Sequence, residues 1–142
     1  MKLIKILTIV LFFSTNVFAD TIYYLLKIPN LEMVDFENNN QIKTFKAKKY
    51  FNVGIKNNNV ECYNPNNQLI KEKQNLIREN IDLYSNFFLN KINLRFLVLC
   101  KDLEVASIPA LGIPNHFLKT IIINIDTGNY KLSRTIHHEI FH

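Results

Sequence analysis

A continuous stretch without glycine or proline, from Gln68 to Ile92, most constrains what this chain can fold into. Its apolar residues recur three and four positions apart, which is the spacing of one face of an α-helix. They are Leu69, Ile70, Leu76, Ile77, Ile81, Leu83, Tyr84, Phe87, Phe88 and Ile92. The pattern predicts one long amphipathic helix, whose apolar face must be covered by a sheet or by other helices.

The chain after this helix alternates between strand and helix patterns. The predicted elements are a strand at Leu94–Cys100, a loop at Lys101–Phe117, a strand at Leu118–Ile125, a turn at Asp126–Asn129 and a helix at Tyr130–His142. The first strand is almost continuously apolar, which is typical of a strand buried on both faces. The loop is inferred from its proline and glycine residues. The order of elements predicts an α+β fold with a mixed sheet.

The chain before residue 67 carries strand patterns separated by asparagine-rich turns. Strands are expected at Thr21–Ile28, Ile42–Ala47, Tyr50–Ile55 and Val60–Tyr63. These short runs and turns predict a small antiparallel β region over residues 20–66, in which we identify no chemistry. Residues 67–142 would form the second unit.

The N-terminus has the three zones of a secretory signal peptide. Met1–Lys5 is basic, Ile6–Phe13 is apolar, and a small residue, Ala19, ends a short polar zone. This arrangement predicts cleavage after Ala19, so that residues 1–19 are removed. The apolar run is too short to span a membrane, and we expect no membrane span after cleavage. The alternative is a buried N-terminal helix. A signal peptide implies a secreted or periplasmic protein.

Two cysteines, Cys62 and Cys100, lie in the part expected to be exported. In an oxidising compartment they can form one disulfide. The alternative is a pair of buried free thiols, because sequence does not show whether the two residues meet.

The formal net charge is +5, and the densest basic group is Lys43, Lys46, Lys48 and Lys49. Aromatic residues lie among these lysines, a combination that can bind nucleic acid. No nucleic-acid motif accompanies it, however. We therefore interpret the group as the solvated face of a strand pair and expect no nucleic-acid partner.

The residues with the clearest chemistry are His138, Glu139 and His142, in the sequence His-Glu-Ile-Phe-His. On a helix, residues four apart lie on the same face, so both imidazoles can reach one ion. Zinc accepts imidazole nitrogen and lowers the pKa of a bound water. A neighbouring carboxylate can take the proton from that water, and the resulting hydroxide can attack a carbonyl carbon. The motif predicts Zn²⁺ as cofactor, with His138 and His142 as ligands and Glu139 as general base. The alternative is a helix end with surface histidines.

The segment Leu118–His142 resembles the edge strand and active-site helix of the zincin metallopeptidases. The run from Leu132 to His142 is similar to the helix of secreted bacterial zinc metallopeptidases, and the likeness covers about Gln68 to His142. It implies that residues 67–142 form the N-terminal half of a zincin-like catalytic domain. It also implies a peptide or protein substrate, and that the strand Leu118–Ile125 lies at the sheet edge and pairs with it.

We expect the side chains around the motif either to pack against the sheet or to lie near the cleft. Leu132, Ile136 and Ile140 form an apolar stripe that should fix the helix to the sheet. His137 can support a ligand or pack, and packing or exposure is favoured. His116 is expected to be exposed, and with Asn115 it can face the cleft. Arg134 and Thr135 lie one turn before His138 and can touch the same face.

The resemblance leaves open the source of the third zinc ligand. In zincins a Glu, His or Asp after the active-site helix supplies it, and no residue follows His142 in this sequence. We expect the chain to be a fragment of a longer peptidase. The alternative is an upstream ligand, Cys62 or Cys100, in the manner of the peptide deformylases. A second hypothesis for the function is a catalytically inactive remnant or a peptide-binding module.

Overall fold

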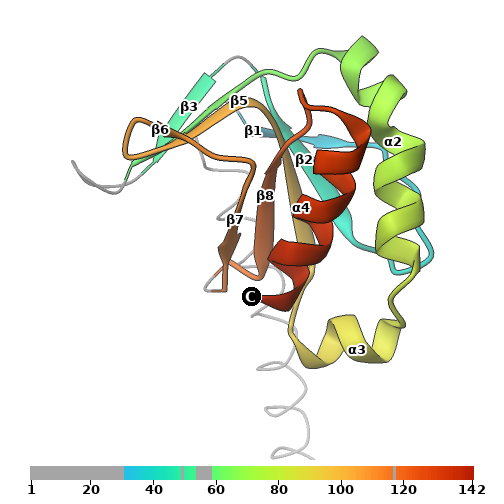
Figure 1. The fold of residues 1–142 in the computed structure, drawn as a ribbon. Helices are drawn as coiled ribbons and strands as arrows, with labels where there is room; N and C mark the ends of the chain where they lie inside the picture. The colour runs from blue at the N-terminus through green and yellow to red at the C-terminus, as the bar shows by residue number, and fades with distance from the viewer. Residues whose placement is uncertain (1–30, 49, 54–58, 117) are drawn as a thin grey trace, which may run out of the picture.

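The computed structural model describes residues 31–48, 50–53, 59–116 and 118–142 (Figure 1). The expected signal peptide at residues 1–19 and the expected strand at Thr21–Ile28 lie outside these ranges, and both stay predictions. Within the described ranges, helices combine with a mixed sheet, which confirms the α+β class.

One mixed sheet forms the centre of the fold (Figure 1). Its strands are β1 (Leu31–Val34), β2 (Lys43–Ala47), β3 (Tyr50–Val53), β4 (Val60–Tyr63), β5 (Phe96–Val105), β6 (Ile108–Pro109), β7 (Gly112–Asn115) and β8 (Thr120–Asn124). In the middle, β2 and β8 each run parallel to β5 on its two sides. At the outer sides, β1 pairs antiparallel with β2, and β7 pairs antiparallel with β8. The second half of β5 pairs with β4 and β6, and β3 pairs with β4.

The strands before residue 67 share this sheet with the later strands instead of forming a region of their own. The pair β3–β4 is antiparallel, as expected for this part of the chain. The pair β1–β2 is also antiparallel, but no strand was predicted at the position of β1. However, β2 also pairs in parallel with β5, with Phe45 opposite Val98. Local sequence patterns do not reveal such a pairing, because it joins segments that are far apart in the chain.

The helices in the described ranges are α2 (Asn67–Asp82), α3 (Asn86–Lys91) and α4 (Asn129–Phe141). The prediction of one helix over Gln68–Ile92 is wrong, because the chain breaks between α2 and α3. Ser85 explains the break: its side-chain oxygen accepts a hydrogen bond from the Phe88 amide at 3.2 Å. Such an N-cap satisfies a free amide and begins a new helix. None of the described helices combines the length and apolar character needed to cross a membrane.

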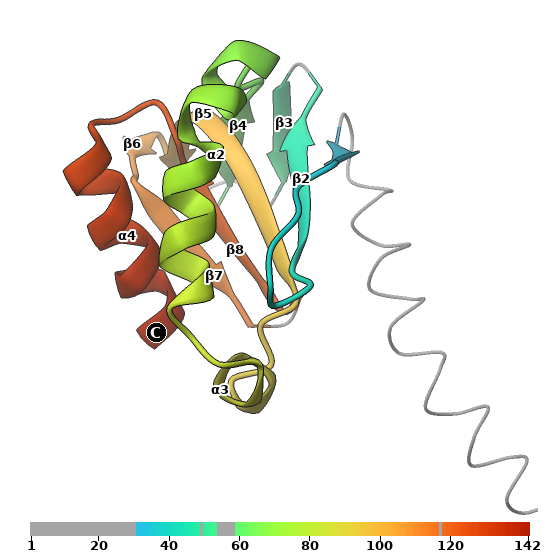
Figure 2. The ribbon, with the colours of Figure 1, turned by 90° about the vertical axis from the view of Figure 1, so that its right-hand side faces the viewer.

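The sheet buries apolar side chains on both faces. α2 and α4 lie side by side over one face (Figure 2). The cluster beneath them includes Ile77, Leu97, Ile123, Leu132 and Ile136, each 0% exposed. Side chains from the other face form a second cluster, which includes Phe45, Phe96, Val98, Cys100 and Ile122. The first half of β5 is therefore buried on both faces, as the continuous apolar run at Leu94–Cys100 predicts.

The outer strand next to α4 is β7, not the strand expected from the sequence. The prediction that Leu118–Ile125 lies at the sheet edge is wrong, because β8 lies between β5 and β7. β7 falls inside Lys101–Phe117, the segment predicted to be a loop. The strand was not predicted because it contains Gly112 and Pro114, and both residue types are rare in strands. Proline is tolerated at an edge, where its missing N–H breaks no ladder.

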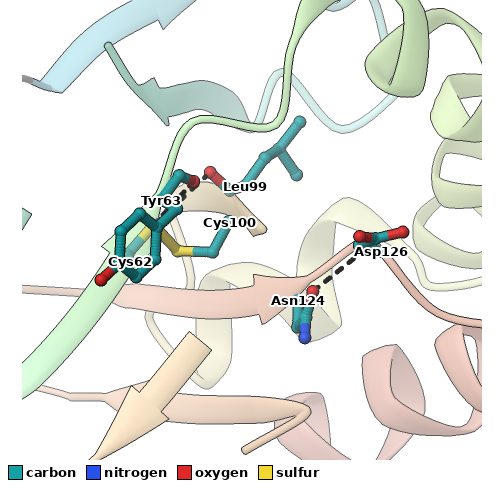
Figure 3. The surroundings of a disulfide bond; sticks show 6 residues. All are labelled: Cys62, Tyr63, Leu99, Cys100, Asn124 and Asp126. Atoms are coloured by element: carbon teal, nitrogen blue, oxygen red, sulfur yellow. Dashed lines mark hydrogen bonds between the residues drawn. A yellow bond between two sulfur atoms is a disulfide. The ribbon is translucent and has the colours of Figure 1, made fainter. Parts of the chain in front are cut away.

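A disulfide between Cys62 and Cys100 links β4 to β5 (Figure 3). Their Cα atoms are 5.3 Å apart, and both residues are fully buried. The disulfide alternative is therefore confirmed, and the alternative of two free thiols is wrong.

The basic group is less solvated than expected, because Lys46 is buried. Its ammonium group lies 3.1 Å from the Glu32 carboxylate and donates a hydrogen bond of 2.7 Å to the Asn67 side chain. Only 9% of Lys46 is exposed. Lys48 lies 3.9 Å from the other Glu32 oxygen, and Lys49 falls outside the described residues. Lys46 therefore connects β1, β2 and the start of α2.

Candidate functional site

The site is built on α4, which the sheet holds by one face. Leu132 and Ile136 are 0% exposed and Ile140 is 3% exposed, so the predicted apolar stripe is confirmed. The opposite face carries His138 and His142, whose side chains are exposed. Because the core fixes the rotation of α4, it also fixes the direction in which these two residues project.

The two imidazole rings converge on one point. The Nε2 atoms of His138 and His142 are 2.9 Å apart, and the ring planes are nearly perpendicular, at 88°. Two nitrogens bound to one tetrahedral zinc ion at about 2.0–2.1 Å would lie about 3.3–3.4 Å apart. The rings therefore need to open by about half an ångström to meet that geometry. The observed Nε2–Nε2 distance is that of a hydrogen bond between the two rings. After this small opening, the same two nitrogens could bind one metal ion.

Glu139 lies beside these rings but is buried, with 7% of the residue exposed. Its Oε2 atom has no hydrogen-bond partner among the described residues. An unpaired buried carboxylate oxygen is costly, and a catalytic role is one of the explanations for it. Burial raises the pKa of the Glu139 carboxyl above its ordinary value, and the charges of His138 and His142 oppose that rise.

Gly112 of β7 makes room for this carboxylate. A Cβ atom added at Gly112 would lie 2.6 Å from Glu139 Cγ and 2.8 Å from its Oε1 atom. Those distances are shorter than any normal contact, so only glycine lets Glu139 lie this close to the strand. Gly112 was not predicted as a site residue, because in the sequence a glycine beside prolines indicates only a loop.

A groove of about 880 Å³ runs along α4 beside the start of β7. It is lined by Leu111, Gly112, Lys131, Arg134, Thr135, His137, His138, Glu139, Phe141 and His142. Arg134 and Thr135 therefore share the groove with His138, as the helical spacing indicates. A smaller hollow of about 40 Å³ continues past Glu139 and His142 and is lined in part by Asn115 and His116. His116 is exposed, as predicted.

His137 lines the groove and also packs against Tyr84. Its Nδ1 atom lies 2.5 Å from the Tyr84 hydroxyl, and the two rings are 5.7 Å apart. Phe88 and Phe141 complete the cluster, with ring distances to Tyr84 of 5.5 and 5.8 Å. Burial raises the pKa of Tyr84. His137 is half-buried in this cluster, which agrees with the prediction that it packs or lies at the surface. The cluster ties the last turn of α4 to the segment between α2 and α3.

The cysteine alternative for a third metal ligand is wrong. Cys62 and Cys100 are joined in a disulfide, so neither has a thiolate to offer. Within the described ranges, no group of three or more His, Cys, Asp or Glu side chains is placed to hold one metal ion. The described part of the site therefore contributes two imidazoles and one nearby carboxylate.

A second hollow, of about 890 Å³, lies at the other side of α2. It is lined mainly by the loop after β1, and this loop is fixed to the end of α2. Asn40 donates hydrogen bonds of 3.0 Å to the carbonyl oxygens of Ile81 and Tyr84. The asparagine-rich loop therefore closes the C-terminal end of the helix, and we assign it no chemistry.

No protein-family model, no curated protein and no solved structure matches this chain. The assignment of a function therefore depends on the geometry of the site.

Proposed function

We propose that this chain carries the zinc site of a secreted peptidase with a zincin-like catalytic domain. The observation that carries the proposal is the convergence of the His138 and His142 Nε2 atoms, 2.9 Å apart, beside the buried Glu139 carboxylate. The donor set suits zinc, which binds imidazole nitrogen and leaves a position open for water. Two features of Glu139 support the same interpretation: its Oε2 atom has no hydrogen-bond partner among the described residues, and Gly112 lets its side chain lie against β7.

Each residue has a separate task in this proposal. His138 and His142 hold the zinc ion, which when bound acidifies a water molecule and polarises a carbonyl oxygen. Glu139 accepts a proton from the attacking water and later delivers it to the leaving amine. Burial supports this task, because it raises the affinity of the carboxylate for a proton.

The arrangement of the elements supports a peptide as substrate. β7 is the outermost strand on its side of the described sheet, and its first residue lies against Glu139. An extended peptide can add to such an edge through main-chain hydrogen bonds. That pairing would bring a peptide bond into the groove next to the imidazoles. The disulfide supports secretion, since disulfides persist in oxidising compartments.

A catalytically inactive peptide-binding remnant is the second candidate. Catalytic zinc sites use three protein ligands, and the described residues supply two imidazoles. Two ligands hold zinc less tightly than three. Zinc retention and hydrolysis therefore distinguish the two candidates.

The test is hydrolysis of a library of quenched fluorescent peptides by the full chain with added zinc. Glu139→Gln should lower the rate by roughly 10²–10⁴-fold while zinc stays bound, since general-base catalysis contributes about that much. The control is Glu79→Gln, which makes the same change at an exposed position of α2 and should leave the rate unaltered. Bound zinc without hydrolysis would overturn the peptidase proposal and favour the remnant.

A further inference from the structure

We propose that the groove selects peptides that carry a carboxylate at the end formed by Lys131 and Arg134. The inference rests on the proposed function and adds a substrate class to it. Both residues line the groove, on the turns of α4 that precede His138. Glu139 is the one acidic residue among the described residues of the lining, and it lies at the opposite, imidazole end. The groove therefore has a positively charged end next to its reactive end.

The positive charge at this end is not neutralised by the described part of the protein. Lys131 and Arg134 are both exposed, and neither lies within 4.0 Å of a described carboxylate. Arg134 instead places its guanidinium carbon 5.7 Å from the centre of the Tyr130 ring. A cation over an aromatic face keeps its charge and its hydrogen-bond donors. An arginine held in this way is suited to bind a carboxylate with two parallel hydrogen bonds.

The spacing along α4 matches a peptide that passes the imidazoles. Arg134 precedes His138 by four residues, which corresponds to about 6 Å along a helix. Lys131 precedes it by seven residues, or about 10 Å. An extended peptide advances about 3.3 Å per residue. A carboxylate near these cations would thus lie roughly two or three residues from the bond at the imidazoles.

Two kinds of peptide carry a carboxylate at that distance. One has an internal Asp or Glu side chain, and the other ends there with its free C-terminal carboxylate. Both use the same chemistry at Arg134, and the experiment separates them.

The experiment measures fluorescence anisotropy of labelled peptides on the full chain carrying Glu139→Gln, with and without zinc. Three peptides of one neutral host sequence are compared: an internal Glu with an amidated end, the Gln counterpart with an amidated end, and the Gln counterpart with a free end. At least one carboxylate peptide should bind roughly three- to tenfold tighter than the neutral peptide at low salt. The preferred peptide identifies the source of the carboxylate.

The variants Lys131→Gln and Arg134→Gln should each reduce that preference, and the pair should abolish it. Lys71→Gln, an equal loss of charge at an exposed position of α2, should leave the preference intact. Circular dichroism checks that each variant is folded. Equal binding of all three peptides, or an unchanged preference in the double variant, would overturn the inference. If the chain binds no zinc but still prefers the carboxylate peptide, the result would support the inference about the groove. It would contradict only the proposed zinc site.

Discussion

Glu139 and Gly112 lie in close contact, so the position of one depends on the size of the other. The Glu139 side chain occupies the space in which any larger residue at position 112 would place its Cβ atom. This close approach fixes where the carboxylate lies relative to the two imidazoles. The position of the proposed general base therefore depends on a residue from a different element.

Gly112→Ala should displace Glu139 from the groove. The added Cβ atom would lie 2.6 Å from Glu139 Cγ, so the side chain must move. Overpacking of this kind costs about 1–3 kcal/mol of the free energy of unfolding. Urea unfolding should show that loss in the native background and a much smaller loss in a Glu139→Ala background.

Gly128→Ala is the matched control, because no atom lies within 4 Å of its added Cβ. An equal cost of Gly112→Ala in both Glu139 backgrounds would show that the two residues are not coupled.

The sequence predicts the ligand pair and the base but not their surroundings. His138 and Glu139 lie in α4 and His142 is its C-cap residue, so their mutual spacing follows from helical periodicity. Gly112 and Tyr84 reach the site from other elements. Their contacts depend on how those elements pack, and a local pattern carries no such information.

At the scale of elements, α4 begins without a stabilising cap. Gly128 occupies the N-cap position, no side chain accepts a hydrogen bond there, and the first turn contains no acidic residue. α2 and α3, in contrast, have side-chain caps from Asn66 and Ser85. The helix that carries the site is therefore held mainly by the burial of its apolar stripe.

Gly128→Asp should stabilise the protein by roughly 0.5–1 kcal/mol. Aspartate can accept a hydrogen bond from a free amide, and its charge interacts favourably with the helix N-terminus. The backbone angles at Gly128, φ −62° and ψ 146°, suit any residue. Thermal unfolding measures the gain.

Gly128→Asn separates the hydrogen bond from the charge, and added salt should reduce the advantage of Asp over Asn. A loss of stability in both variants would contradict the description of an uncapped helix.

Two turns explain why the element boundaries differ from those predicted. Ala106 and Ser107 connect β5 to β6 with φ values of 51° and 64°. This conformation is typical of Asn-Gly, so an Ala-Ser pair does not indicate a hairpin. The chain reverses there because cross-strand pairing outweighs the local preference. Ser85, in contrast, is a recognisable N-cap that the continuous apolar periodicity obscured.

At the scale of the whole molecule, the disulfide connects the strands before α2 to the centre of the sheet. It joins residues that are 38 positions apart, across β4 and β5. Because β5 also pairs with β2 and β8, the link stabilises the arrangement on which α4 rests. The possibility of a disulfide could be inferred from the cysteine count, while the proximity of the two residues required the fold.

Replacing both Cys62 and Cys100 with Ala should lower the free energy of unfolding by about 4 kcal/mol, because closure of a loop of this length restricts the unfolded chain. Denaturant unfolding of the native chain and of the double variant measures the difference. Reduction of the native chain should produce a similar loss, and it should leave the double variant unaffected. Equal stabilities under oxidising and reducing conditions would contradict the structural role of this link.

The proposed function requires that His138 and His142 bind one zinc ion through their Nε2 atoms. X-ray absorption spectroscopy on the zinc-loaded full chain tests it most directly. We expect at least two imidazole nitrogens at about 2.0–2.1 Å from the metal, and the loss of one in His138→Ala and in His142→Ala. His116→Ala is the control, and it should leave the spectrum unchanged. A spectrum without imidazole scattering, or one that neither of the two ligand variants alters, would contradict the account.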